Sequence, residues 1–120
     1  MILIIGGAYQ GKLDYAKNTF GISDEQVHTC TGAEIDFSKR CIYRLEAFTQ
    51  AQPDATAYFQ ANRQCWQDSV LICQDISAGV VPLGEEMRLW RQNNGRLLQY
   101  LSREANQVIR IFCGLGQRLK

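Results

Sequence analysis

The sequence predicts an α/β fold, a mostly parallel sheet flanked by helices, in one domain that spans residues 1–120. Short runs dominated by apolar residues, at residues 2–5, 69–75 and 107–114, are typical of strands buried on both faces of a parallel sheet. Segments with apolar residues at helical spacing lie between them, most clearly EEMRLWRQNNGRLLQYLSREA. Strands that alternate with helices favour parallel pairing, because each helix carries the chain back to the same edge of the sheet.

Each expected element has its own local signal. Gly21 can end the first helix because glycine readily adopts the left-handed conformation found after helices. The dipeptide Gln52-Pro53 interrupts the helical middle of the chain, and Asp54 is a candidate N-cap for the helix that follows. The expected strands are residues 2–5, 27–30 (VHTC), 69–75 and 107–114, and the expected helices are Lys12–Phe20, two segments within residues 36–67, and residues 85–105.

The composition excludes several classes of protein. A net charge of +1 gives no bulk attraction to nucleic acid, so we expect no nucleic-acid partner. The apolar opening is only five residues long, and no segment reaches the ~20 apolar residues that cross a bilayer. We therefore expect a cytoplasmic protein with no membrane contact.

The cysteines and the histidine predict neither disulfides nor a metal site. Five cysteines are an odd number and include no C-x-x-C pair, and a single His28 leaves little room for a zinc site. Cys30, Cys73 and Cys113 lie in apolar runs, so we expect buried, reduced thiols and no metal-binding residues.

The segment GGAYQGK, between the first strand and the first helix, has the spacing of a phosphate-binding loop. Gly6, Gly11 and Lys12 match G-x-x-x-x-G-K, in which backbone N–H groups and the helix N-terminus face phosphate oxygens and the lysine reaches the outer phosphates. A glycine-rich turn that binds nothing is the alternative. The residues expected to bind GTP or ATP here are Gly6, Gly7, Ala8, Gln10, Gly11, Lys12 and Leu13.

Leu13 stands where this motif has the hydroxyl that ligates Mg²⁺, which puts metal-assisted phosphoryl transfer in doubt. Such sites also place an acidic residue at the end of a neighbouring strand. Asp75, which ends SVLICQD, is the best candidate, although a turn-capping carboxylate explains it equally well. Lys12 and Asp75 are the predicted catalytic residues.

Arginines cluster on the predicted C-terminal helix. Arg88 and Arg91 are three residues apart and share a helix face, so we predict that they stabilise nucleotide charge, with Arg96 as a further candidate. A solvated helix face is the alternative.

The two ends of the chain share motifs with one known family. The opening MILIIGGAYQGK matches M-I-L-V-T-G-G-x-R-S-G-K-S, and the tail matches at GVVP (residues 79–82), Arg88, Trp90, Arg91, Gly95, Gln99, Gly114, Leu115 and Leu119. These motifs resemble those of the bifunctional adenosylcobinamide kinase / adenosylcobinamide-phosphate guanylyltransferase family of cobalamin biosynthesis. The resemblance implies a P-loop NTPase-like three-layer core, GTP or ATP as nucleotide, a corrinoid such as cobinamide as substrate, and a homo-oligomer assembled through helices.

The chain also departs from the family pattern. Gln74 and Asp75 replace Asn-Glu, and residues 36–50 lack the histidine that accepts the guanylyl group in the family. His28 lies too early to take that role, so guanylyl transfer is not expected. The chain is short between the second strand and residues 69–75, where the family has a strand ending in an acidic residue, so we expect fewer strands than usual.

Two functions agree with these residues. One is a cobinamide kinase-type phosphotransferase that binds GTP or ATP at residues 6–13, and the other is a binding or oligomeric interaction module without phosphoryl transfer. Leu13 and the absent histidine favour the module, whereas the intact glycines and Lys12 argue against a remnant that binds nothing.

Overall fold

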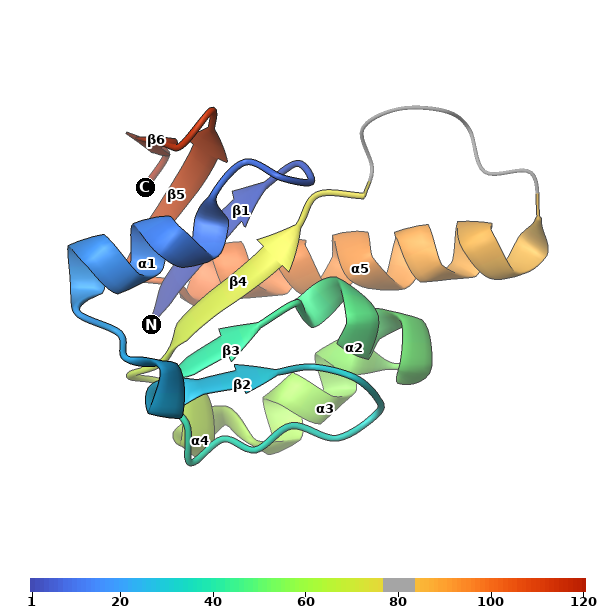
Figure 1. Cartoon of the computed structure of the whole chain (residues 1–120). Coiled ribbons are helices and arrows are strands. Elements are labelled where there is room, and N and C mark those ends of the chain that lie inside the picture. Colours follow the sequence, from blue (N-terminus) through green and yellow to red (C-terminus); the bar gives the residue numbers. More distant parts are fainter. Residues whose placement is uncertain (77–83) are drawn as a thin grey trace.

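The computed structural model describes residues 1–76 and 84–120, which form three layers with a sheet between helices (Figure 1). In chain order the elements are β1 (Ile2–Gly6), α1 (Lys12–Phe20), the 3-10 helix η1 (Asp24–Gln26), β2 (Val27–Thr29), β3 (Cys41–Tyr43), α2 (Leu45–Ala51), α3 (Ala55–Ala61), α4 (Arg63–Trp66), β4 (Val70–Gln74), α5 (Glu85–Glu104), β5 (Gln107–Phe112) and β6 (Leu115–Arg118). The described strands form one six-stranded sheet in the order β2-β3-β4-β1-β5-β6. All neighbours pair in parallel except β5 and β6, so the predicted fold class is confirmed.

β1 lies in the interior of the sheet. Leu3 is opposite Leu71 of β4 and Val108 of β5, and both Leu3 and the next residue, Ile4, are fully buried. Successive side chains of a strand point to opposite faces, so a strand covered on both faces needs apolar residues at consecutive positions. This is why residues 2–5 have no polar alternation.

The two faces of the sheet are covered unequally. α1 packs on one face, where Ala16 joins Ile4, Ile72 and Ile109 in one buried cluster. The helices α2 to α5 cover the other face, as Figure 1 shows, and their buried side chains include Phe48, Phe59, Trp66, Leu97 and Leu101.

The prediction of an entirely helical segment over residues 36–67 is wrong at its start, because Cys41–Tyr43 form β3. This strand pairs with β2 on one side and with β4 on the other, so the strand expected to be absent is present. Three residues are too few to show a period, and their strand conformation is fixed by pairing with neighbours distant in sequence. The break at Gln52-Pro53 is confirmed, and Asp54 caps α3 by accepting a hydrogen bond from the Ala57 amide at 3.1 Å.

The last predicted strand, residues 107–114, is in fact a hairpin. β5 ends at Phe112, and Cys113 and Gly114 have φ angles of 51° and 76°, the left-handed pair that a tight two-residue turn requires. β6 returns antiparallel to β5 and was not predicted. Cys113 is therefore exposed, against expectation, because the turn lifts it out of the sheet.

Cys30 and Cys73 are buried as expected, and all five cysteines are free thiols. The GVVP segment at residues 79–82 lies outside the described residues. Within the described ranges, no helix combines the length and apolar character that crossing a bilayer requires.

Candidate functional site

The glycine-containing loop lies at the carboxyl end of β1 and leads directly into α1 (Figure 1). Ligands of open parallel sheets bind at this end of the strands. A Cβ on Gly6 would lie 2.7 Å from the Ile111 carbonyl oxygen, so glycine allows β5 to approach. Gly11 has φ 85° and precedes α1 without a capping side chain, which leaves the first-turn amides of the helix without a side-chain acceptor at their N-cap.

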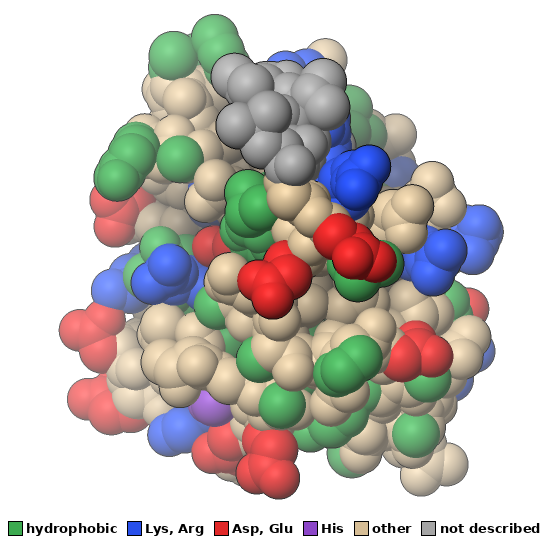
Figure 2. Space-filling model, turned by 90° about the vertical axis from the view of Figure 1, so that its right-hand side faces the viewer, with side chains coloured by type: hydrophobic (Ala, Val, Ile, Leu, Met, Phe, Trp, Pro, Cys, Tyr) green, Lys and Arg blue, Asp and Glu red, His purple; other side chains and the backbone are tan. Residues whose placement is uncertain are grey.

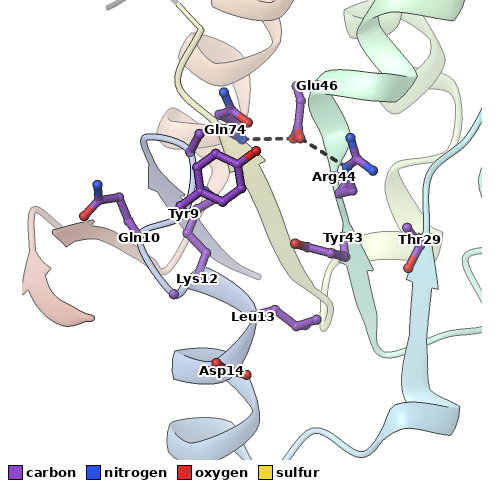
Figure 3. A pocket seen from close by; sticks show the side chains of 12 residues that line it. Tyr9, Gln10, Lys12, Leu13, Asp14, Thr29, Tyr43, Arg44, Glu46 and Gln74 are labelled. Atoms are coloured by element: carbon purple, nitrogen blue, oxygen red, sulfur yellow. Dashed lines mark hydrogen bonds and ion pairs between the residues drawn. The ribbon is translucent and has the colours of Figure 1, made fainter. Parts of the chain in front are cut away.

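A cavity of about 690 Å³ lies beside this loop. One wall is the loop and the start of α1, and the other is formed by the ends of β2, β3 and β4 and the start of α2 (Figure 3). The lining residues are Ala8, Tyr9, Gln10, Gly11, Lys12, Leu13 and Asp14 on the loop wall, and Thr29, Tyr43, Arg44, Glu46 and Gln74 on the strand-end wall. Five of the seven predicted loop residues thus lie together, whereas Gly6 and Gly7 line a second hollow.

Lys12 is folded back onto its own loop. Its Nζ donates a hydrogen bond to the Gly7 carbonyl oxygen at 2.6 Å, and the residue is only 9% exposed. Burial lowers the Lys12 pKa below the ordinary lysine value, and the negative charge of Glu46 partly opposes this shift. The loop therefore holds a desolvated cation whose acceptor is a neutral carbonyl.

Glu46 is the residue that the sequence analysis missed. It lies in the first turn of α2, is 8% exposed, and accepts a hydrogen bond from the Gln74 amide at 3.0 Å through Oε1. Its Oε2 lies 3.6 Å from Arg44 Nε. The signal that could have identified Glu46 is an acidic residue three positions after a strand. The sequence analysis did not use this signal because it did not predict β3.

Three side chains of α2 and α5 form hydrogen bonds that hold the segment around Glu46 in place. Trp90 Nε1 donates to the Glu46 carbonyl oxygen at 2.8 Å, and the Thr49 hydroxyl donates to Asn94 Oδ1 at 2.8 Å. Asn94 is 1% exposed, and its Nδ2 donates to the Gln74 carbonyl oxygen at 3.4 Å. The start of α2 is thus tied to α5 and to the end of β4.

Asp75 lies on the other side of the loop. Its amide donates to the Gly6 carbonyl oxygen at 2.8 Å, and the residue lines the second hollow together with Gly6, Gly7 and Arg110. The structure therefore does not bring Asp75 into the cavity that Lys12 lines.

The arginines predicted to contact nucleotide lie on α5. Arg88 and Arg91 are in its N-terminal half, and neither lines the cavity. Arg96 lines a separate groove between α2 and α5, beside Thr49 and Trp90. On the side of the molecule toward which this half of α5 extends, basic and acidic side chains are interspersed (Figure 2).

His28 lies in β2 and does not line the cavity. Its Nε2 is buried without a hydrogen-bond partner among the described residues. No group of three or more His, Cys, Asp or Glu side chains in residues 1–76 and 84–120 is arranged to hold a metal ion. At position 13 the aliphatic side chain supplies no oxygen ligand for Mg²⁺.

One comparison with known proteins assigns the chain to a family. The profile of the cobinamide kinase / cobinamide phosphate guanyltransferase family matches residues 37–119, from before β3 to beyond β6, and does not include the loop or α1. A comparison with curated proteins found no match. Because the matched region covers more than half of the chain, the protein belongs to the cobinamide kinase / cobinamide phosphate guanyltransferase family.

Proposed function

We propose that this chain is a nucleotide-binding member of its family, which holds the phosphate groups of GTP or ATP in the cavity beside residues 6–13. The observation that carries the proposal is the placement of Lys12 and the uncapped start of α1 on one wall of that cavity. Helix N-termini favour anions because their free amides and dipole are positive. The phosphate groups of the proposed ligand therefore lie at the N-terminus of α1.

Binding exchanges one acceptor of Lys12 for another. The ammonium leaves the Gly7 carbonyl oxygen, which it contacts at 2.6 Å, and donates to a phosphate oxygen. The ammonium is attracted more strongly to the full negative charge of a phosphate oxygen than to the partial charge of a carbonyl oxygen. The buried position of Lys12 increases this difference, because solvent screens the pair less.

Phosphoryl transfer to a corrinoid hydroxyl is the second candidate function. It is supported by the extent of the cavity, which continues past the loop to Thr29 and Tyr43 and leaves room for an acceptor beside the phosphates. Guanylyl transfer is not part of the proposal, because the one histidine of the chain, His28, lies outside the cavity. Leu13 favours binding without transfer.

The proposal is tested by titrating the wild-type protein and Lys12→Ala with fluorescent GTP and ATP, in Mg²⁺ and in EDTA. We expect binding in both buffers, weakened at least about tenfold by the substitution, because a charged hydrogen-bond donor is lost. Lys17→Ala is the matched control, since Lys17 lies on the same helix but pairs with Asp24 outside the cavity. Its affinity should equal that of the wild type.

Equal binding by wild-type protein and Lys12→Ala, or no binding by wild-type protein, contradicts the proposal. Consumption of GTP or ATP that depends on added cobinamide identifies the second candidate. Binding without consumption identifies a module that has lost phosphoryl transfer.

A further inference from the structure

Arg44 occupies an unusual backbone position at the edge of the cavity. It directly follows β3, and its φ of 64° is in the left-handed region that non-glycine residues rarely adopt. Its carbonyl oxygen accepts a hydrogen bond from the Ala47 amide at 3.0 Å, so the turn into α2 fixes this conformation. Unfavourable backbone conformations of this kind cluster at binding sites.

The Arg44 side chain is weakly engaged by the protein. It is 54% exposed, and its ion pair with Glu46 is a single contact of 3.6 Å through Nε. An arginine that is fully committed to a carboxylate makes two shorter parallel bonds instead. Within the described part of the chain, the Arg44 side chain makes no hydrogen bond in addition to this ion pair. The guanidinium can therefore turn toward a ligand without losing a strong contact.

The charged residues that line the cavity indicate that Arg44 balances negative charge on a bound ligand. Among its described lining residues the cations are Lys12 and Arg44, on opposite walls, and the acids are Asp14 and Glu46 (Figure 3). A nucleoside triphosphate carries several negative charges, more than one lysine and a helix N-terminus neutralise. Leu13 supplies no oxygen for a metal that would balance the rest.

We propose that Arg44 forms a second anion subsite, which contacts the outermost phosphate of a polyphosphate from the strand-end wall, while residues 8–13 hold the phosphates from the loop wall. The proposal deepens the proposed function and rests on it. The guanidinium exchanges Glu46 for phosphate oxygens, and the planar fork of arginine suits two oxygens of one phosphate group. Glu46 keeps its bond to the Gln74 amide, so the wall of the cavity stays in place.

The test compares Arg44→Asn with the wild type in EDTA, using GTP, GMP and inorganic tripolyphosphate as ligands. Asparagine removes the charge and tolerates the left-handed conformation, so thermal unfolding of this variant should match the wild type. We expect the affinity for GTP and tripolyphosphate to fall about tenfold and that for GMP to change less than about twofold. Arg44→Lys should fall between the two.

Arg40→Asn is the matched control. Arg40 is exposed, flanks β3 at its opposite end, and carries the same charge outside the cavity. Its substitution should leave all three affinities within about twofold of the wild type, because a distant surface charge is screened by salt.

The outcomes separate this inference from the proposed function. If Lys12→Ala abolishes GTP binding but Arg44→Asn does not alter it, only the Arg44 subsite is wrong. Equal losses for GTP and GMP also overturn it, because the contact would then lie at the inner phosphate. Arg44-dependent binding of tripolyphosphate without GTP binding would retain the subsite and overturn the nucleotide assignment, whereas binding of none of the three ligands would overturn both.

Discussion

The loop wall of the cavity and its strand-end wall differ in where their residues come from. The loop wall is one continuous stretch, residues 8–14, which runs from the loop after β1 into the start of α1. The strand-end wall collects five side chains from four elements that are up to 45 positions apart, from Thr29 to Gln74. The family match includes most of the strand-end wall and none of the loop. A continuous wall can be recognised by its spacing, whereas a composite wall becomes visible only when the order of strands is known.

The largest expected effect is at Gly6, the last residue of β1, which precedes the loop wall. An alanine Cβ there would lie 2.7 Å from the Ile111 carbonyl oxygen, and that oxygen belongs to the β5 backbone, which cannot move without disturbing the pairing with β1. We expect Gly6→Ala to lower the free energy of unfolding by about 3 kcal/mol, measured by urea denaturation.

Gly7→Ala is the control for Gly6. The nearest atom to its added Cβ is Gln10 Cγ at 3.8 Å, an ordinary contact, so stability should change by less than about 0.5 kcal/mol. Equal stability of the two variants would show that close packing against β5 does not fix the loop wall.

The next effect tests whether the strand-end wall depends on Glu46. Glu46→Ala removes the acceptor of the Gln74 amide, and a partly buried N–H group without a partner costs about 1 kcal/mol. Glu46→Gln retains an acceptor oxygen and should lose less than half of this amount. Urea denaturation of the two variants and the wild type ranks them. A loss in Glu46→Gln as large as that in Glu46→Ala would contradict the role of the Glu46 carboxylate as the acceptor of the Gln74 amide.

The smallest effect concerns the protonation of Lys12. Its pKa lies below 10.5 because burial disfavours the ammonium, and anion binding requires the ammonium. The affinity for ATP, which has no group that titrates in the alkaline range, should therefore fall as the pH rises toward 10.5. Lys12→Arg stays charged and should lose this dependence. The same alkaline fall in both proteins would assign it to another group.

The sequence and the structure agree on β1 and on the loop that follows it, because both have local signals. The spacing of Gly6, Gly11 and Lys12 predicted a loop between β1 and α1, and the run of apolar residues predicted β1. β3 was missed because three residues carry no period, and Glu46 was missed with it. Asp75 was placed correctly at the end of β4, but the side of the loop on which it lies depends on how β1 and β4 pack, which no local pattern encodes.

The turn at Cys113 and Gly114 has a consequence for how the chain folds during its synthesis. The Cys113 amide donates to Gln10 Oε1 at 2.6 Å and the Gly114 amide to the Gln10 carbonyl oxygen at 2.9 Å, so this turn braces the loop wall. β1 also pairs with β4 on one side and with β5 on the other, and both strands come from the second half of the chain. During synthesis on a ribosome, β1 must therefore wait for these two partners, and its loop gains its brace only after residue 114 has left the exit tunnel.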